Sequence, residues 1–589
     1  MEVIRSNFRE VLSELDKVLK EASFLCIDTE FTGLNTGPDA TAFDTPAQYY
    51  SKIRSGSMDF LLVQFGLSVF SFDKESNKYN QQSYNFYVFP RPLNRGAFDC
   101  RFVCQASSIA FLANQGFDFN KLFNHGIPYM TKNEEEKLQK KLEERQRIRE
   151  EGLDIVPIPD HDKPQIEEIC SKIEEFINSE AEELSVDRCN GFIRRLVHQE
   201  SRRRWPKKVN LEFKSDGPGQ TIVITKTGTK EEEEKKEAEK REKEKQELEE
   251  AVGLSALLRK IANSGKLIVG HNMLLDLCHI IRQFFNPLPE KYSEFKALVH
   301  GLFPRILDTK VISQSPPFKD KMSFSSLQIL LETLSKPPFS IPEVVPVKDR
   351  SYSTSCEKCH EAGYDAYMTG LCFISMSNHL GSLENPPIDT VLSDSPLLNP
   401  FVNKLIIARL KDVPYINLAG KDPNPSRDHV FHLSFPREWK MSDITQLFNP
   451  YGGVFVSWLS DTSAYVSLNK RDQTKTVLKN VLNTDAFTIK KYAEHQVSTE
   501  LQTSTQVLRK RKLNSDGETS PKNGTEKKDE DGWEVVQGKG ILWLFKIICG
   551  NMGPMTFFGL CFTCLIFIVM FYLFSLFFDC NAKNVIDRY

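Results

Sequence analysis

Phe24-Leu-Cys-Ile-Asp-Thr-Glu-Phe31 is a compact apolar run that closes on two acidic residues and is followed by Thr32-Gly33. A short apolar run with a glycine at its end is typical of a buried β-strand. Asp28 and Glu30 stand two positions apart, so their carboxylates lie on the same side of this strand. Carboxylates held together in this way offer the oxygen ligands that Mg²⁺ prefers. Such a pair is common after a strand, so it becomes a candidate divalent-metal site only together with the motifs that follow.

The segments around this strand alternate between helical and extended patterns. Residues 4–19 repeat apolar side chains at helical spacing, which predicts an amphipathic helix with Ile4, Phe8, Leu12, Leu15 and Leu19 on one face. Aromatic and β-branched residues predict two further strands, at 58–70 and 84–89. Further along, a helix at 254–263 leads to a strand at 266–269. Strands that alternate with helices in this way predict an α/β domain.

Two dense runs of Glu, Lys and Arg interrupt this α/β pattern, at residues 132–152 and 230–250. Opposite charges recur at four-residue spacing in both runs, which predicts solvated helices with many surface ion pairs. Residues 160–225 between them form a distinct piece with its own basic cluster. We interpret this piece as an insertion, after which the first domain resumes near Ala251.

The overall composition places few limits on the partners of the chain. Its 589 residues allow roughly two to four domains. The net charge of −3 conceals strong local runs, and a basic patch of the kind that binds nucleic acid occurs only locally. The thirteen cysteines are scattered and odd in number, as in a protein of a reducing compartment rather than a disulfide scaffold.

Two later motifs add carboxylates and a histidine to the acidic strand. His271-Asn-Met-Leu-Leu-Asp276 follows the strand at 266–269, so Asp276 stands at a strand-to-helix junction. In His360-Glu-Ala-Gly-Tyr-Asp365, the two end residues would face about 140° apart in one helix. We therefore expect His360 in a loop and Asp365 in the first turns of the next helix. Phosphodiester hydrolysis by two metal ions, about 4 Å apart, needs such carboxylates and a base for the attacking water.

The order of these motifs resembles that of a known enzyme family. Asp28-Thr-Glu-Phe31, His271-Asn-x3-Asp276 and His360-x4-Asp365 resemble the DEDD exonucleases, in the subclass whose third motif carries a histidine. Longer stretches resemble the poly(A)-specific ribonuclease (PARN) family, at residues 57–66, 111–120, 307–310 and 360–367. This resemblance implies a ribonuclease-H-like α/β fold and a magnesium-dependent 3′-to-5′ exoribonuclease.

The resemblance implies a role for each residue of the acidic set. Asp28 would bridge two Mg²⁺ ions, for which Mn²⁺ can substitute, and Glu30, Asp276 and Asp365 would complete their ligands. His360 would take the proton of the attacking water, as an imidazole that titrates near neutral pH can do. The products would be nucleoside 5′-monophosphates and an RNA shortened at its 3′ end.

The same resemblance implies where the RNA end binds. Phe31 and Leu34 would pack against the terminal base, and His271 and Lys310 would approach the phosphates. Thr29 departs from the family, which has glycine at this position. Because neighbouring side chains of a strand point to opposite faces, we expect Thr29 to have no effect on metal binding.

Residues 156–230 resemble a small nucleic-acid-binding module. Arg194 and His198 match the arginine-x3-histidine signature of a family of single-strand-binding domains, and Trp205 follows a run of arginines. Cations take phosphates and a tryptophan stacks on a base, so we expect these three residues to contact RNA. A solvated basic helix face is the alternative interpretation.

Residues 428–490, within a domain expected at 401–495, resemble the RNA-recognition-motif fold, with short strands expected at 429–435, 454–459 and 461–468. Of the usual aromatic positions on such a sheet, Tyr465 remains. Trp458 stands where the family stacks a methylguanosine cap, so it is a candidate RNA contact. The same residue equally fits core packing or dimerisation.

The C-terminal region differs sharply in composition from the rest. Residues 496–540 are rich in Ser, Thr, Lys and Glu with almost no aromatic side chains, which predicts a disordered linker. Residues 555–578 are uncharged and, at roughly 36 Å as a helix, long enough to span a bilayer. We expect 541–589 to be a tail anchor in the endoplasmic reticulum or the mitochondrial outer membrane, with the catalytic part cytosolic. Imaging a reporter fused to 540–589 distinguishes these membranes.

These patterns together predict the domain order. The exonuclease domain is expected at 1–155 and 231–400, the inserted module at 156–230, the recognition-motif-like domain at 401–495, the linker at 496–540 and the anchor at 541–589.

The expected function is trimming of the 3′ ends of piRNA precursors, which are single-stranded RNA. The membrane-anchored PARN-like-domain branch of the family trims piRNA precursors, which implies a PIWI-clade Argonaute and a Tudor-KH adaptor as partners. The family also implies a homodimer. A membrane-tethered deadenylase of mRNA poly(A) tails and a non-catalytic RNA-binding tether are the alternatives. A trimming enzyme degrades RNA of mixed sequence, whereas a deadenylase stops outside poly(A). Both release product in the presence of magnesium, whereas a tether only binds RNA.

Overall fold

The structure is a computed structural model that describes residues 1–498, apart from gaps at 93–99, 152–154, 187–188, 207, 217–218, 227–229, 323–325 and 353–359. The linker expected from residue 496 and the span expected at 555–578 therefore lie almost wholly outside the described residues. None of the helices in the described part of the chain combines the length and the hydrophobicity that a membrane crossing requires.

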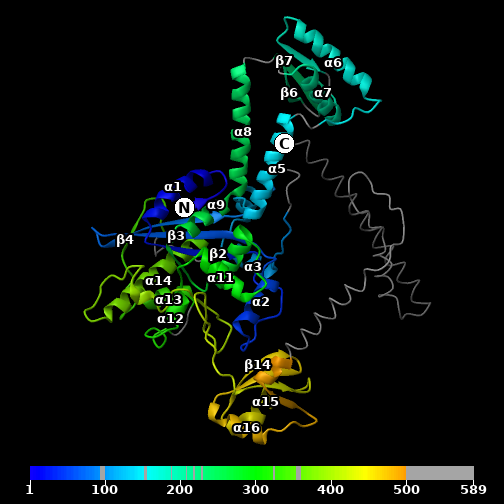
Figure 1. Cartoon of the computed structure of the whole chain (residues 1–589). Coiled ribbons are helices and arrows are strands. Elements are labelled where there is room, and N and C mark those ends of the chain that lie inside the picture. Colours follow the sequence, from blue (N-terminus) through cyan, green and yellow to red (C-terminus); the bar gives the residue numbers. More distant parts are fainter. Residues whose placement is uncertain are drawn as a thin grey trace, which may run out of the picture. The chain divides into compact units, whose positions relative to one another are not determined.

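A seven-stranded mixed sheet forms the centre of the first domain and confirms the expected α/β class (Figure 1). Its strands follow the order β1-β4-β3-β2-β8-β9, and β10 pairs with β4 off this path. β2 pairs antiparallel with β3 and parallel with β8, so both of its edges are covered. The strands are β1 (Glu2–Val3), β2 (Phe24–Phe31), β3 (Leu62–Asp73), β4 (Lys78–Tyr87), β8 (Leu267–Gly270), β9 (Ile306–Asp308) and β10 (Val344–Pro346).

The alternation of side chains along β2 explains why helices cover both faces of the sheet. Phe24 and Cys26 belong to one buried core, and Leu25 and Ile27 belong to the other. A continuous apolar run is what a strand needs when both faces are buried. The core with Leu25 takes in α1 (Phe8–Glu21), α2 (Pro46–Gly56), α9 (Leu254–Asn263), α10 (Leu274–Ile280), η1 (Ile281–Phe285) and α11 (Tyr292–Leu302). The core with Phe24 takes in α12 (Thr309–Ser313), α13 (Leu327–Leu334), α14 (Ala362–Ser382) and η2 (Pro396–Leu398).

The amphipathic helix expected from residue 4 begins later, at Phe8. Glu2–Val3 instead forms β1, which pairs in parallel with β4. The side-chain oxygen of Asn7 accepts a hydrogen bond from the backbone N–H of Ile4 at 2.8 Å, which closes a turn between strand and helix. Two shorter helices, α3 (Ala106–Asn114) and α4 (Phe119–His125), pack with the ends of β3 and β4.

Two charged helices lead from the first domain to the inserted module and back. The two charge runs form the helices α5 (Lys132–Glu151) and α8 (Lys230–Val252), as predicted, and these helices pack against each other (Figure 1). The module between them has a hydrophobic core of its own and an antiparallel sheet in the order β5-β7-β6. Its elements are α6 (Lys163–Asn178), β5 (Glu183–Val186), α7 (Gly191–Arg204), β6 (Val209–Asp216) and β7 (Gly219–Lys226).

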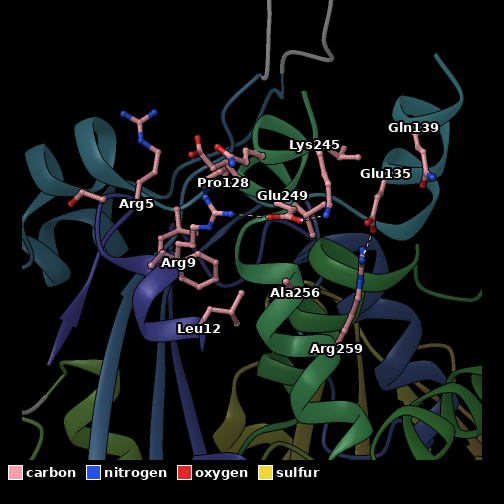
Figure 2. Close-up of a pocket in the computed structure, with 17 residues that line it drawn as sticks. Arg5, Arg9, Leu12, Pro128, Glu135, Gln139, Lys245, Glu249, Ala256 and Arg259 are labelled. Carbon is pink, nitrogen blue, oxygen red and sulfur yellow. Dashed lines mark hydrogen bonds and ion pairs between the residues drawn. The ribbon is translucent and has the colours of Figure 1, made fainter. Parts of the chain in front are cut away.

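A cavity of about 1140 Å³ lies between α1 and the ends of the two charged helices (Figure 2). Two ion pairs join its walls, one between Arg9 and Glu249 at 3.5 Å and one between Arg259 and Glu135. Pairs of this kind near a surface add little stability. The residues predicted to be catalytic do not line this cavity.

A four-stranded antiparallel sheet forms the last described domain. Its elements alternate as β-α-β-β-α-β and its strands follow the order β14-β15-β13-β16, which is the topology of an RNA-recognition motif. The elements are β13 (Val430–Ser434), α15 (Met441–Phe448), η3 (Asn449–Tyr451), β14 (Val454–Ser460), β15 (Ser463–Leu468), η4 (Arg471–Gln473), α16 (Thr474–Asn480) and β16 (Thr488–Lys491).

The expected start of this domain at residue 401 is wrong. A hairpin of β11 (Lys404–Ile406) and β12 (Tyr415–Asn417) precedes the four-stranded sheet. Leu405 and Ile416 of this hairpin are buried in the core of the first domain. The hairpin therefore belongs to the exonuclease domain, and the recognition-motif-like domain begins after it.

Candidate active site

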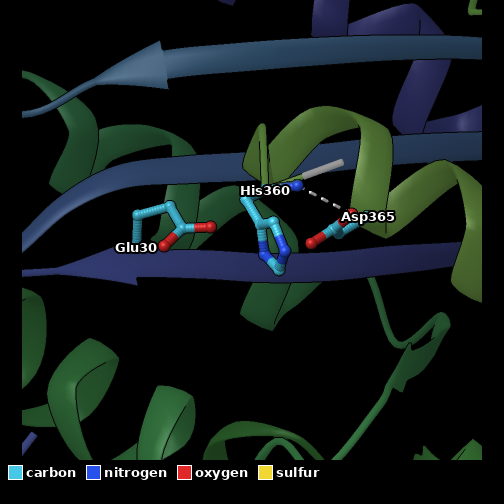
Figure 3. A group of neighbouring side chains, drawn as sticks. All are labelled: Glu30, His360 and Asp365. Atoms are coloured by element: carbon cyan, nitrogen blue, oxygen red, sulfur yellow. Dashed lines mark hydrogen bonds between the residues drawn. The ribbon is translucent and has the colours of Figure 1, made fainter. Parts of the chain in front are cut away.

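Four acidic side chains and one histidine come together where β2 ends. Asp28 and Glu30 lie on β2, whereas Asp276 and Asp365 lie in the first turns of α10 and α14. The atoms that Glu30, His360 and Asp365 offer to a ligand lie within 4.8 Å of one another (Figure 3). Three segments that are far apart in the sequence thus meet at one point, as their motifs predict.

The start of α14 is fixed to the sheet by side chains of β3 and β4. The Gln64 side chain accepts a hydrogen bond from the Ala362 N–H at 3.0 Å, and Asn85 accepts one from the next N–H at 3.2 Å. These N–H groups stand in the first turn, where a helix supplies no acceptor of its own. Gly66 of β3 lies directly below, and a side chain there would collide with the Ala362 carbonyl. This close approach brings the first-turn carboxylate of α14 to β2.

His360 stands in the turn before α14, as predicted. Its φ is +68°, a left-handed conformation that few residues other than glycine adopt. Its ring meets the ring of Phe111 edge-on at 4.8 Å, and its backbone N–H lies 3.4 Å from the Asp365 carboxylate. Partial burial lowers the pKa of His360, which favours the neutral imidazole that can accept a proton. Backbone strain of this kind is frequent at functional sites.

Burial raises the pKa values of the four carboxyl groups, and neighbouring carboxylates raise them further. Burial raises the pKa of Asp28 well above its ordinary value, and the neighbouring charges of Asp365, Asp276 and Glu30 raise it further. Burial also raises the pKa of Asp365 to about 7 and that of Asp276 to about 6. Acids crowded in this way ionise readily only when a cation neutralises them.

This set of donors fits divalent cations that prefer oxygen ligands. Carboxylates suit Mg²⁺ and Mn²⁺, whereas softer metals select thiolates. A cation at this point relieves the repulsion that raises the pKa values, because it is the largest local charge of such a site. Asp28, Glu30, Asp276 and Asp365 are therefore the residues that would hold a metal.

Thr29 contacts the acidic set, so the expectation that its side chain lies away from the metal ligands is wrong. Its Oγ1 donates a hydrogen bond to Asp276 Oδ1 at 2.5 Å. Alternation along β2 turns Asp28 towards the layer of α14 and Thr29 towards the layer of α10, which carries Asp276. The acidic residues therefore come from both helical layers of the domain. The hydrogen bond from Thr29 lowers the pKa of Asp276, whereas burial raises it.

Replacing Thr29 with valine is expected to lower activity by about tenfold. This is the lower end of the range observed when a residue that hydrogen-bonds to a metal ligand is lost. Valine keeps the shape of threonine but leaves Asp276 without its donor. The metal concentration that gives half-maximal activity should rise in Thr29→Val and stay near the parent value in Thr29→Ser, which keeps the hydroxyl. An unchanged metal requirement in Thr29→Val would show that the hydrogen bond does not orient Asp276.

Two of the four residues expected to bind the RNA end flank the end of β2. Phe31 is its last residue, and its ring packs on that of His279 with centroids 4.5 Å apart. Leu34 is 54% exposed and lines a cavity of about 260 Å³ together with Asn272 and Arg409. An exposed apolar side chain beside a cavity and a metal site is suited to cover a base.

The other two, His271 and Lys310, flank Asp308, a residue that sequence reasoning missed. The Asp308 carboxylate is fully buried and accepts the backbone N–H groups of Asn272 at 2.9 Å and Lys310 at 3.0 Å. His271 Nδ1 lies 2.9 Å from the hydroxyl of Thr309. Burial lowers the pKa of Lys310. The missed signal is an aspartate between a strand and a helix, the position of a helix N-cap.

The residues expected to contact RNA in the two smaller domains lie outside this cluster. Arg194 and His198 are on α7, where burial lowers the pKa of His198. Trp205 follows α7 and packs against the core of the inserted module. Trp458 is 39% exposed and meets the ring of Phe435 edge-on at 5.3 Å. Both tryptophans therefore contribute to packing, and their contact with RNA stays a prediction.

Comparison with known proteins relates the chain to ribonucleases. It matches the CAF1 family ribonuclease over residues 3–373 and an RNA binding domain over residues 420–498. It is 44% identical over 526 residues to the poly(A)-specific ribonuclease PARN of Homo sapiens, covering 84% of this chain and 80% of that protein. It is 42% identical over 559 residues to PARN of Xenopus laevis, covering 92% and 85%. It is 28% identical over 514 residues to the pre-piRNA 3′-exonuclease trimmer of Bombyx mori, covering 85% and 94%.

The ribonuclease match and the geometry of the site agree. The matched residues, 3–373, include β2, both helix starts and His360, which together form the acidic cluster. The match covers more than half of the chain, and the PARN relatives extend it over most of the remainder. The chain thus belongs to the CAF1 family of ribonucleases, among the PARN-type enzymes.

Proposed function

We propose that the chain is a 3′-to-5′ exoribonuclease that releases nucleoside 5′-monophosphates from single-stranded RNA with two magnesium ions. The observation that carries this proposal is the cluster of Glu30, His360 and Asp365, whose ligand atoms lie within 4.8 Å. The raised pKa of Asp28 beside it supports a site built for cations. Membership of a ribonuclease family supports RNA as the substrate.

Each residue of the site has a separate role in the proposed hydrolysis. Asp28, Glu30, Asp276 and Asp365 would hold the two ions, which when bound stabilise the charge on the attacking and leaving oxygens. His360 is exposed and its pKa is lowered, so its neutral ring reaches water and accepts the proton of the nucleophile. Lys310 and His271 would neutralise and orient the phosphates, and the exposed Leu34 would cover the terminal base.

Two kinds of RNA are candidate substrates. The relatives at 42–44% identity are named poly(A)-specific ribonucleases, which favours adenylate tails. The trimmer of Bombyx mori and the uncharged span at 555–578 favour piRNA precursors matured at a membrane. Because the identity to the PARN relatives is higher, we place adenylate tails first and piRNA precursors second. The Argonaute and Tudor-KH partners, the membrane anchor and the homodimer stay predictions.

Two RNAs of equal length, one of adenylate only and one of mixed sequence, test this proposal and separate the substrates. In Mg²⁺ we expect the chain to shorten both from the 3′ end, with adenylate faster by at least about tenfold. Chelation of the metal should stop both reactions, because the carboxylates alone supply no charge stabilisation. Equal rates on the two RNAs would favour trimming. Binding of RNA without product in Mg²⁺ would contradict the enzyme and identify a tether.

A further inference from the structure

The outer face of the four-stranded sheet is covered by other parts of the chain. Phe431 and Leu433 of β13 point into the core of the domain, whereas Val430 and His432 point to the opposite face with Tyr465 of β15. On this face Val430 is 0%, His432 8% and Tyr465 4% exposed. In a recognition motif this face ordinarily presents its aromatic side chains to bases. Here the same positions are buried.

The first covering segment is residues 41–44, from the loop between β2 and α2 of the exonuclease domain. Phe43 is 1% exposed, and its ring meets those of Tyr465 and Phe455 edge-on with centroids 6.0 Å apart. The backbone N–H of Ala42 donates to the Ser457 hydroxyl at 3.3 Å. The loop therefore presents both a buried ring and a backbone donor to the sheet.

The second covering segment is the helical stretch 492–498 that follows β16. The His495 ring stacks on that of His432 with centroids 3.7 Å apart, and its Nδ1 lies 2.9 Å from the Tyr465 hydroxyl. The Tyr492 hydroxyl donates to the carbonyl of Phe43 at 2.8 Å. The two covering segments thus bond to each other as well as to the sheet.

Arg427, just before β13, joins both domains at the edge of this contact. Its guanidinium is 9% exposed and makes two hydrogen bonds of 2.7 Å to Asp412, which lies in the hairpin of the exonuclease domain. It also donates to the carbonyls of Phe43 and Asp44, the latter at 3.1 Å. A buried guanidinium needs all of these acceptors, and they all belong to the exonuclease domain. Arg427 therefore holds the two domains in one relative position.

The loop that ends in this contact begins at the catalytic strand. It leaves β2 after Phe31, carries the exposed Leu34 and enters α2 at Pro46. Leu34 and Asp39 of the loop line the same cavity of about 260 Å³, which Leu275, the residue before Asp276, lines as well. The contact at Phe43 therefore holds the far end of a loop whose near end faces the RNA terminus.

We propose that the outer face of the recognition-motif-like sheet is a docking surface for residues 41–44, and that this docking positions the RNA-binding loop 32–44. Phe43 is then a positioning residue that acts through Leu34. The chemistry of the surface fits this occupant: it offers buried rings and one paired arginine, whereas RNA requires exposed cations and open aromatic faces. The kinetic part of the proposal rests on the proposed exoribonuclease function.

Hydrogen exchange of the full chain tests the docking without reference to activity. We expect backbone amides of 32–44 to exchange at least about tenfold faster in Phe43→Ala and Arg427→Ala, because each variant frees one end of the loop. Arg437→Ala is the matched control, since Arg437 pairs with Asp461 on the exposed surface of the same domain. Phe43→Leu should restore protection. Tyr492→Phe loses the hydrogen bonds of its hydroxyl with the Phe43 carbonyl and the Arg427 guanidinium but keeps the ring, so it should give a smaller increase. Unchanged exchange in Phe43→Ala and Arg427→Ala would overturn the docking surface.

Kinetics and added RNA then test what the docking does. We expect kcat/KM to fall by about tenfold or more in Phe43→Ala through a higher KM, with an unchanged requirement for Mg²⁺, because the loop and not the metal site is displaced. An altered metal requirement with an unchanged KM would overturn the positioning role. Slower hydrogen exchange in β13 and β15 of the parent on addition of RNA, together with faster exchange in 41–44, would also overturn it. The outer face of the sheet would then bind RNA instead of the loop. If the parent chain shortens no RNA, the proposed function fails while the exchange result still decides the docking.

Discussion

Asparagine in place of Asp28 is expected to slow the shortening of RNA by more than about 100-fold. Loss of a residue that only hydrogen-bonds to a metal ligand already lowers activity by about 10- to 100-fold, and Asp28 would be a ligand itself. The substitution preserves the size of the side chain and removes a charge that faces Asp365, Asp276 and Glu30. Initial rates on a single-stranded RNA in Mg²⁺ measure the effect. Asp320→Asn, an exposed carboxylate outside the site, is the matched control and should keep the parent rate.

The same variant should be more stable to heat than the parent when metal is absent. Burial and repulsion raise the pKa of Asp28 in the folded state, so its ionisation at neutral pH costs free energy of folding. This cost is absent below the ordinary pKa of an aspartate, near about 4, and grows as the pH rises above it. Thermal unfolding in a chelator should therefore give Asp28→Asn a higher Tm at about pH 8 and an equal Tm near about pH 4. A variant with full activity and a lower Tm would contradict both the ligand role and the electrostatics.

Replacing His360 with asparagine is expected to lower kcat by about 10²- to 10⁴-fold, the usual contribution of a general base. Asparagine tolerates the left-handed backbone of this position, where φ is +68°, so the turn before α14 should persist. Because His360 is exposed, the free energy of unfolding should change little. The measurement is kcat at saturating Mg²⁺ and saturating RNA.

The pH profile distinguishes a base from a residue that merely supports the turn. Partial desolvation by the surrounding protein lowers the pKa of His360, so protonation removes the base only below the ordinary histidine range near about 6.5. At saturating Mg²⁺, kcat of the parent should rise with pH through this region and then level off. The profile of His360→Asn should lack this rise. A variant that retains the rise would show that another group accepts the proton.

Local sequence patterns were sufficient to predict the acidic strand and the placement of His360 and Asp365 at the start of α14. The apolar run 24–31 forms β2 with the bounds of the run itself, because a strand buried on both faces needs apolar residues without a break. His360 and Asp365 fall on either side of the α14 start, because the helical period excludes both from one face. These features depend only on residues that are close in sequence.

Contacts that depend on packing between distant segments could not be predicted in this way. Thr29 reaches Asp276 because α10 covers the face of the sheet to which Thr29 points, and no pattern near Thr29 indicates which helix lies there. Phe43 is a single aromatic residue in a polar loop, and its burial depends on a domain nearly 400 positions along the chain. Similarly, the first half of β4 is polar, and its Gln81 and Ser83 are buried through hydrogen bonds with Ser68 that hydropathy does not reveal.

Release of the 3′-terminal nucleotide, followed on a single-stranded RNA labelled at that nucleotide, tests the acidic site most directly. If Asp28, Glu30, Asp276 and Asp365 hold the metal, the parent chain should release labelled nucleoside 5′-monophosphate first and only in the presence of Mg²⁺. Asp28→Asn should release at most about one hundredth as much in the same time. Equal release by parent and variant, release in a chelator, or labelled fragments longer than one nucleotide would contradict a metal-dependent 3′-to-5′ exoribonuclease at this site.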